Sequence, residues 1–327
     1  MTQNILEVKG LTKHFEVNGG LFRKKGKVRA VESISFDLFP SETLGIVGES
    51  GSGKSTLGRL ILRLLKPTAG EVIYKGQEIL GLSNKEFSSI RSNLQMVFQD
   101  PYASLNPRVK IGDAIAEPMV ANKKVSNVKE AQEKTRELLE IIGLRADMYQ
   151  RFPHEFSGGQ RQRISIARAI ALEPKVLVCD EAVSALDVSV QAQILNLFNQ
   201  LKKQLDLTYI FISHDLSVVK YISDRILVMY LGEVMEIAPT EDLFAHTYHP
   251  YTEALISAIP EPLAQSSKKR IILEGDIPSP LNPPSGCKFS TRCFKSMEIC
   301  HRIRPDMCEY RPGHFVRCHI YNEGKEV

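Results

Sequence analysis

The segment Gly48-Glu-Ser-Gly-Ser-Gly-Lys-Ser55 has residue types and a spacing that suit the binding of a phosphate. It fits the pattern G-x4-G-K-[ST] and stands between a predicted strand, Thr43–Gly48, and a predicted helix, Lys54–Leu65. Glycines let successive backbone N–H groups turn inward around a phosphate, and the helix N-terminus adds a positive dipole. The alternative, a Gly/Ser-rich turn that happens to carry a lysine, is disfavoured by the flanking strand and helix.

In such a loop the lysine and the serine after it have separate tasks. Lys54 is expected to span the β- and γ-phosphates of a nucleotide, and the Ser55 hydroxyl is expected to ligate Mg²⁺. The nucleotide-binding residues expected in this segment are Gly48, Ser50, Gly51, Gly53, Lys54, Ser55 and Thr56.

A pair of carboxylates follows a short apolar strand, Val176–Cys179. The strand delivers Asp180 to the carboxyl edge of a sheet, where Mg²⁺ would be held, usually through water. Glu181 points differently and is placed to accept a proton from an attacking water. By itself the pair could be an acidic turn after a core strand; together with the phosphate loop it predicts nucleotide hydrolysis.

A second candidate phosphate-binding helix start lies far along the chain, at Phe156-Ser-Gly-Gly-Gln-Arg161. One chain rarely needs two cradles for one nucleotide, so Ser157, Gly158, Gly159 and Gln160 are expected to grip the γ-phosphate bound to a partner subunit. Standing alone, the motif would be an ordinary glycine-rich helix start.

Three further residues fit the same site. Asp187 follows the acidic pair closely and could line that subunit interface. His214, after the strand Thr208–Ile212, is placed to sense the γ-phosphate. Gln99, at the end of a strand from Leu94, could contact Mg²⁺ and whatever moves when a nucleotide binds.

The elements that must position these residues alternate between strand and helix, which predicts a mainly parallel sheet with helices on its faces. Ile34, Phe36 and Leu38 have the period-two spacing of a half-buried strand. A helical subdomain is expected at about 106–157, with one apolar stripe formed by Val128, Ala131, Thr135, Leu138 and Ile142.

The whole chain has 327 residues, 42 Lys+Arg and 38 Asp+Glu, so a nucleic-acid partner is not required by charge. No apolar run approaches the roughly 18 residues of a membrane span, and the start lacks the order of a signal peptide. A boundary is expected near residue 260, where a proline-rich arm containing Lys268-Lys-Arg270 leads to a cysteine-rich end. The predicted domains are therefore 1–260 and 261–327.

Taken together, these motifs resemble the ATP-binding-cassette (ABC) ATPases over about 5–260, in the right order. The resemblance implies a P-loop cassette with a mainly parallel core, an antiparallel β subdomain and a helical signature subdomain, in which two cassettes sandwich two ATP molecules. It also implies catalytic roles for Glu181, His214, Lys54 and Gln99. Phe15 occupies the place of the aromatic residue that stacks on adenine, although it could equally be a core strand residue.

The sequences of four other segments are similar to those of the oligopeptide/dipeptide importer ATPases: Gln95–Arg108, Phe152–Ser157, His249–Thr252 and the end of the chain from Pro278. This resemblance implies a peripheral subunit at the cytoplasmic face of the membrane, working with a second related ATPase, two permease subunits and an external substrate-binding protein. Nickel or another small cargo stays open in place of peptide. Ala182 departs from the family's proline, which is expected to loosen the turn that carries Glu181.

Cys287, Cys293, Cys300 and Cys318 resemble that family's four-cysteine iron–sulfur motif, and Cys308 is left over. Four thiolates suit either a [4Fe–4S] cluster or a tetrahedral zinc ion, and spacing alone does not choose between them. His301, His314 and His319 keep mixed ligation open, and five free cysteines in a loose tail are the remaining alternative.

Two rival functions carry less weight. A non-transport ABC ATPase acting on DNA or ribosomes usually has long coiled-coil insertions or two fused cassettes, and this chain has one cassette and no sustained heptads. A P-loop GTPase is disfavoured because Asn84-Lys85-Glu86 is followed by Phe87 rather than the aspartate of a guanine-reading motif.

Overall fold

A computed structural model describes residues 4–17, 26–259 and 270–321 of the chain. The chain divides into two compact units: the first comprises residues 1–39, 43–80 and 213–327, and the second comprises 40–42 and 81–212. The cysteine-rich end therefore belongs to the same unit as the N-terminal strands. The expected boundary at 260 and the start of the Lys268-Lys-Arg270 run lie outside the described residues.

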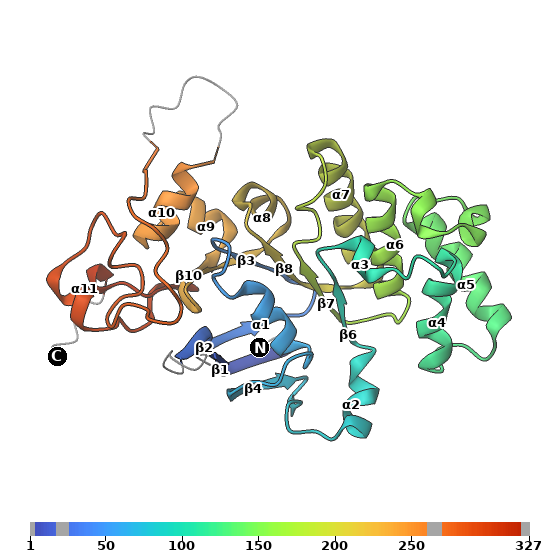
Figure 1. Cartoon of the computed structure of the whole chain (residues 1–327), viewed down its shortest axis with the longest axis horizontal. Helices are drawn as coiled ribbons and strands as arrows, with labels where there is room; N and C mark the ends of the chain where they lie inside the picture. Colours follow the sequence, from blue (N-terminus) through green and yellow to red (C-terminus); the bar gives the residue numbers. More distant parts are fainter. Residues whose placement is uncertain (1–3, 18–25, 260–269, 322–327) are drawn as a thin grey trace. The chain divides into compact units, whose positions relative to one another are not determined.

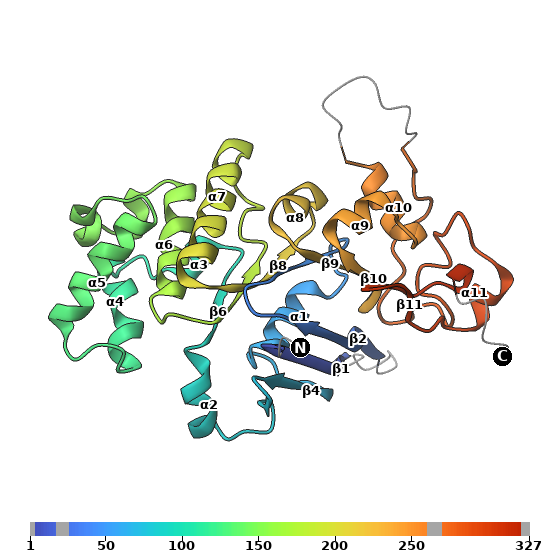
Figure 2. The ribbon, with the colours of Figure 1, turned by 180° about the vertical axis from the view of Figure 1, so that it is seen from behind.

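The first unit contains a four-stranded antiparallel sheet, drawn in blue in Figures 1 and 2. Its order is β2 (Gly26–Leu38), β1 (Leu6–Val17), β4 (Ala69–Tyr74) and β5 (Gln77–Glu78). Ile34, Phe36 and Leu38 of β2 are all buried, which confirms the period-two prediction. The antiparallel part of the expected fold is thus present.

A second sheet of the first unit carries the phosphate loop. Strand β3 (Thr43–Val47) runs parallel to β9 (Arg225–Tyr230), and β10 (Glu233–Pro239), β12 (His314–Val316) and β11 (Cys308–Arg311) follow in antiparallel order. The unit's helices are α1 (Lys54–Ile61), α8 (Leu216–Ile222), α9 (Thr240–Ala245), α10 (Pro250–Ser257) and α11 (Glu298–Arg302). The β11–β12 hairpin therefore joins the end of the chain to this sheet.

The second unit is built on three parallel strands, in the order β8 (Thr208–Ser213), β7 (Val176–Asp180) and β6 (Leu94–Val97). Their register aligns Val97 with Cys179 and Cys179 with Phe211, so the carboxyl ends of all three strands meet at one edge. The helices are α2 (Asn84–Arg91), α3 (Pro101–Ser104), α4 (Ile111–Ala121), α5 (Val128–Ile141), α6 (Gly158–Ile170) and α7 (Val188–Leu205), with short 3₁₀ turns at Ala146–Gln150 and Pro153–Glu155.

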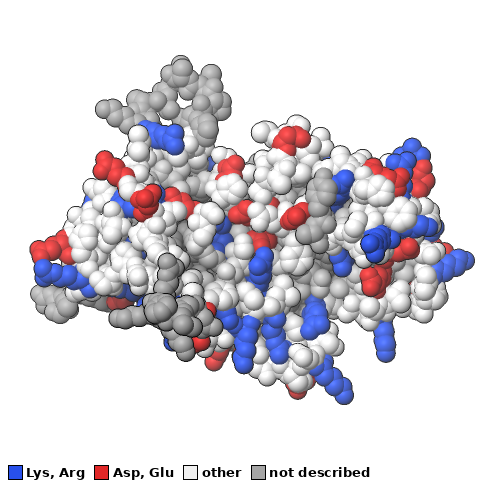
Figure 3. All heavy atoms as spheres, viewed as in Figure 1, with Lys and Arg blue, Asp and Glu red and all other residues white. Residues whose placement is uncertain are grey.

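The apolar stripe of α5 differs from the sequence expectation at its first and fourth positions. Val128 opens the helix and is 59% exposed, one turn before the buried part of the helix begins. Leu139 is buried in place of Leu138, which is only half-buried. Basic and acidic side chains are interspersed over α4 and α5 in Figure 3, as on a solvated helical face.

The predicted helix Lys54–Leu65 ends earlier, at Ile61. Arg63 adopts a left-handed φ of 57°, and the N–H groups of Leu64 and Leu65 both turn back to the Arg59 carbonyl. This local turn ends the helix before the apolar pattern ends. Among the residues that the structure describes, none of the helices combines the length and apolarity needed to span a membrane.

Candidate nucleotide site

The phosphate loop joins β3 to α1 within the first unit. Gly53 caps α1 with a left-handed φ of 101°, and a side chain there would bring a Cβ within 2.1 Å of the Ala30 carbonyl oxygen. Lys54 is buried, and its Nζ donates to the carbonyl oxygens of Gly48 at 2.7 Å and Glu49 at 3.0 Å. The lysine ammonium is therefore held by the backbone at the start of the loop, where a loop of this kind receives phosphate.

Of the remaining candidates of the first unit, Gly48 is buried and the others are exposed or partly exposed. Ser50 and Gly51 are exposed, and Ser55 and Thr56 are partly exposed. Phe15 near the end of β1 is 38% exposed, with the Lys13 Nζ 5.0 Å from its ring centroid, so it is not a core residue. His214 follows β8 and is exposed.

The acidic pair lies at the carboxyl edge of the second unit's sheet. Asp180 ends β7 and is 1% exposed. Gln99 lies two residues beyond β6, which ends at Val97 rather than at Gln99 as expected. Its Nε2 donates to the Glu181 Oε2 at 2.9 Å. The structure thus brings together two residues that the sequence separates by 82 positions.

The turn after β7 is held by hydrogen bonds around Glu181. Glu181 has a left-handed φ of 47°, and its N–H donates to the Ile212 carbonyl at 3.0 Å. Its own carbonyl accepts from the Ser184 N–H at 3.1 Å and from the Ser184 Oγ at 3.0 Å. These bonds fix the peptide groups on both sides of Glu181 although Ala182 stands in the position of the family's proline.

The signature segment forms a regular helix start. Ser157 caps α6 in a reciprocal capping box with Gln160. A Cβ added to Gly159 would stand 2.4 Å from the Val190 Cγ1, so this glycine also allows α6 to approach α7. Gly158 has no such neighbour, since the nearest atom, of Leu186, would be 3.8 Å away.

Asp187 caps the next helix, α7. Its side chain accepts from the Ser189 hydroxyl at 2.7 Å and from the Val190 N–H at 2.9 Å. These two hydrogen bonds lower the pKa of the Asp187 carboxyl, so the group is ionised at the helix N-terminus.

Within the first unit, then, lie the phosphate loop, Phe15 and His214, and within the second lie Gln99, Asp180, Glu181, Asp187 and the signature residues.

The four candidate ligand cysteines lie close enough together for their thiols to interact electrostatically. Burial raises the pKa of the Cys287 thiol to about 12, and the charges of Cys300, Cys318 and Cys293 add to the increase. The backbone N–H groups two residues further on act against burial and lower the pKa values of Cys287, Cys293 and Cys318. Among residues 4–17, 26–259 and 270–321, however, no group of three or more His, Cys, Asp or Glu side chains is arranged to hold a metal ion.

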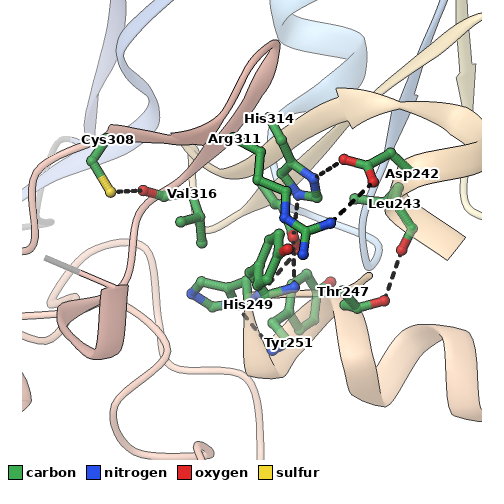
Figure 4. Close-up of polar contacts among 11 residues, drawn as sticks. Asp242, Leu243, Thr247, His249, Tyr251, Cys308, Arg311, His314 and Val316 are labelled. Carbon is green, nitrogen blue, oxygen red and sulfur yellow. Dashed lines mark hydrogen bonds and ion pairs between the residues drawn. The ribbon is translucent and has the colours of Figure 1, made fainter. Parts of the chain in front are cut away.

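The two other cysteines have different surroundings. The Cys308 Sγ lies 3.4 Å from the Val316 carbonyl oxygen, to which it donates (Figure 4). Cys179 is fully buried in β7, and burial together with the charge of Asp180 raises the pKa of its thiol. The last described residues of the extension are thus ordered by β11, β12 and a 3₁₀ turn at His319–Tyr321 rather than loose.

The histidines of the extension have other partners. The Nε2 of His314 bonds to Glu236 at 2.8 Å and its Nδ1 bonds to Asp242 at 2.6 Å, so neither ring nitrogen is available to a metal (Figure 4). The His319 Nε2 is bonded to the Ile303 carbonyl at 2.9 Å, and the His301 Nε2 lies 3.2 Å from the Ser296 Oγ. Mixed ligation that includes His314, one of the alternatives left open by the sequence, is therefore disfavoured.

Two residues near the phosphate loop were missed at the level of sequence. Tyr251 and Arg292 both bond to Glu49, the second residue of the loop. Tyr251 lies in the segment His249–Thr252, which was distinguished only by its sequence resemblance to the importer ATPases. Nothing marked Arg292, which lies 243 positions from its partner.

Comparisons with known proteins agree with this architecture. Residues 31–184 match the family described as "ABC transporter". A dimeric post-hydrolysis state of the ATP-binding cassette MJ0796, bound to ADP and Pi, is 27% identical and superposes with a TM-score of 0.64, covering 72% of this chain and 98% of that one. The structure of cbiO1 from Clostridium perfringens has the same TM-score and covers 74% of this chain and 91% of that one. The fold and the site define an ATP-binding cassette of the ABC class.

Similarity over nearly the whole chain narrows the class further. Residues 235–300 match "Oligopeptide/dipeptide transporter, C-terminal region". The oligopeptide transport ATP-binding protein AppF of Bacillus subtilis is 51% identical over 98% of both chains. The dipeptide transport ATP-binding protein DppF of Haemophilus influenzae is 50% identical over 96% of both. The chain belongs to the oligopeptide/dipeptide ABC transporter ATP-binding proteins.

Proposed function

We propose that this chain is the ATP-hydrolysing motor subunit of an importer of di- and oligopeptides. The names and the near-full-length similarity of AppF and DppF support the peptide cargo. The dimeric state of the MJ0796 cassette supports pairing with a second, related ATPase subunit. We further propose two permease subunits and an external substrate-binding protein as partners, a place at the cytoplasmic face of the membrane, and no nucleic-acid partner.

The observation that carries the hydrolytic role is the 2.9 Å hydrogen bond between Gln99 Nε2 and Glu181 Oε2. A carboxylate has several lone pairs, so Glu181 can accept this hydrogen bond and still act as a base toward an attacking water. The hydrogen-bonded turn around Glu181 fixes the position of that carboxylate. Lys54 contributes a positive charge to the phosphates, and we propose that it exchanges its bonds to the loop carbonyls for bonds to ATP.

The proposed Mg²⁺ ligands are chemically suited to that ion. Ser55, Gln99 and Asp180 offer hydroxyl, amide and carboxylate oxygens, which are the donors that Mg²⁺ prefers. When bound, Mg²⁺ would neutralise charge on the phosphates. Ser157–Gln160 and His214 keep the γ-phosphate roles proposed from the sequence. Asp187 keeps its proposed place at the subunit interface, and Phe15 keeps the adenine-stacking role.

Replacing Glu181 with glutamine tests the hydrolytic role. The variant is expected to lose turnover by about 10²–10⁴-fold, the contribution of a general base, while it still binds ATP. Glu133→Gln, on the exposed face of α5, is the matched control and should hydrolyse ATP like the wild type. Unchanged hydrolysis by the Glu181 variant would exclude this role.

The cargo requires an uptake measurement. A strain lacking this chain should lose uptake of labelled di- and oligopeptides, and the wild-type gene should restore it. Loss of nickel uptake with normal peptide uptake would instead assign the motor to a metal importer.

For the extension we propose a [4Fe–4S] cluster held by Cys287, Cys293, Cys300 and Cys318, without a part in ATP hydrolysis. Two features support this set: the four thiols interact electrostatically, and nearby backbone N–H groups favour the thiolate forms of Cys287, Cys293 and Cys318. A zinc ion needs thiolates about 2.3 Å from one centre. Among the described residues, no group of three or more His, Cys, Asp or Glu side chains is arranged to hold a metal ion, so the metal content of the purified protein must decide between a cluster and zinc.

Anaerobic purification tests the cluster directly. The wild type should show broad visible absorption and contain iron, and Cys300→Ser should lose both. Cys308→Ser, which changes the cysteine outside the proposed set, should retain them. A colourless protein that contains zinc would refute the proposal.

A further inference from the structure

Glu49 directly follows Gly48, the first glycine of the phosphate loop, and its carboxylate is held by the extension. Arg292 donates from Nη1 to one carboxylate oxygen at 2.6 Å and from Nη2 to the other at 3.2 Å. The Arg292 side chain is 8% exposed and that of Glu49 is 25% exposed. A two-pronged, largely buried pair of this kind fixes orientation as well as distance.

The backbone of Glu49 is held from the same region of the chain. Its N–H donates to the Tyr251 hydroxyl at 2.9 Å. Burial raises the pKa of Tyr251, so the hydroxyl stays neutral and can accept this bond at any physiological pH. Tyr251 lies at the start of α10, within the matched C-terminal family region.

Aromatic packing ties these two contacts together. The rings of Tyr230 and Tyr251 lie 4.8 Å apart, and Phe289 packs against both, at 5.3 and 5.2 Å. The guanidinium of Arg292 lies 5.9 Å from the centre of the Tyr230 ring. All three rings are buried, so they form a rigid base for the groups that contact Glu49.

The same peptide orients the lysine of the loop. The Glu49 carbonyl accepts from Lys54 Nζ at 3.0 Å and from the Ser52 N–H at 3.2 Å. Releasing the Glu49 side chain would therefore loosen the carbonyl that aligns Lys54. It would also leave an unpaired carboxylate in a loop that must accept a polyphosphate, and like charges repel.

From these contacts we propose that Arg292 is a positioning residue of the nucleotide site: it neutralises Glu49 and holds the phosphate loop in its binding shape. The inference rests on the proposed role of Gly48–Ser55 in binding ATP. The proposal gives the C-terminal extension a role in the nucleotide site, because Arg292, the counter-ion of Glu49, directly precedes the proposed cluster ligand Cys293.

Binding of MgATP to the full-length chain tests the proposal. Arg292→Ala should weaken binding about 10-fold, the worth of one charge-assisted hydrogen bond. Arg302→Ala should bind like the wild type, because Arg302 pairs with Glu298 on the exposed surface of the same extension. The KM for ATP should rise in the Arg292 variant more than kcat falls.

The double variant Glu49→Gln, Arg292→Ala tests whether Arg292 acts by neutralising the charge of Glu49 or only by supporting the fold. The double variant should regain part of the lost affinity, because glutamine does not repel phosphate. A double variant as weak as Arg292→Ala would overturn the proposed charge role. If Arg292→Ala fails to fold, Arg292→Lys, which keeps the charge but loses the two-pronged geometry, should show a smaller loss of affinity.

Lys54→Ala distinguishes a failure of the Arg292 proposal from a failure of the phosphate-loop assignment. If this variant loses MgATP binding while Arg292→Ala binds normally, the inference about Arg292 is wrong and the phosphate loop stands. If Lys54→Ala binds like the wild type, the assignment of the loop itself is wrong.

Discussion

Replacing His314 with glutamine is expected to destabilise the first unit in a pH-dependent way. His314 is fully buried in β12, between Glu236 of β10 and Asp242 of α9, and Arg311 of β11 also approaches Asp242 (Figure 4). Burial lowers the pKa of His314, but the hydrogen bonds to the two carboxylates outweigh it, so the net pKa is raised. At pH values below this raised pKa, the ring is thus a charged link between the end of the chain and the sheet.

The size of the effect follows from burial. Glu236 is also fully buried, and besides the imidazole it accepts hydrogen bonds from the N–H groups of Tyr248 and His249. Breaking a buried ion pair by removing one partner costs about 3–5 kcal/mol. At about 2–4 °C per kcal/mol for a unit of this size, the melting temperature should fall by about 6–20 °C.

The sign of the pH dependence is fixed by the direction of the pKa shift. The stabilisation from His314 is complete below the unfolded pKa of about 6.5 and is lost as pH rises through the higher folded pKa. Thermal unfolding should therefore show the wild type and His314→Gln converging as pH rises. His301→Gln, at an exposed histidine of the same extension, is the control and should match the wild type. A stability difference that stays constant across this range would refute the charged link.

Two more predictions concern packing and protonation. Gly159→Ala should destabilise the second unit by about 1–3 kcal/mol in urea unfolding, because the added Cβ would meet Val190. Gly158→Ala, the control, should cost less because no atom lies as close to that position. Equal losses of stability would contradict the close approach of α6 and α7. Burial, with the charge of Arg317, lowers the pKa of His249 to about 3, so NMR spectra should show a neutral ring down to about pH 4. The contribution of this group to the stability of the fold should decline as pH falls below about 6.5, the pKa in the unfolded chain. A His249 ring that titrates near its ordinary pKa would contradict this buried environment.

Local patterns determined much of the candidate site. The phosphate loop, the acidic pair and the signature helix each lie within a few consecutive residues, so spacing alone indicated their chemistry. Strands such as β7 and helices such as α8 were also predictable, because their apolar runs and flanking turn residues are continuous in the chain. The sequence could therefore predict the cassette and name the candidates for its catalytic groups.

The tertiary structure decided which distant groups meet. Glu49 and Arg292 are 243 positions apart, and His314 is 78 positions from Glu236, so no periodicity or motif links either pair. Gln99 and Glu181 meet only because parallel pairing of β6 and β7 aligns their carboxyl ends. Chemistry that depends on consecutive residues can be predicted from sequence, whereas partners for buried charges are chosen when strands and helices pack, which is why only the structure joined the cysteine-rich end to the phosphate loop.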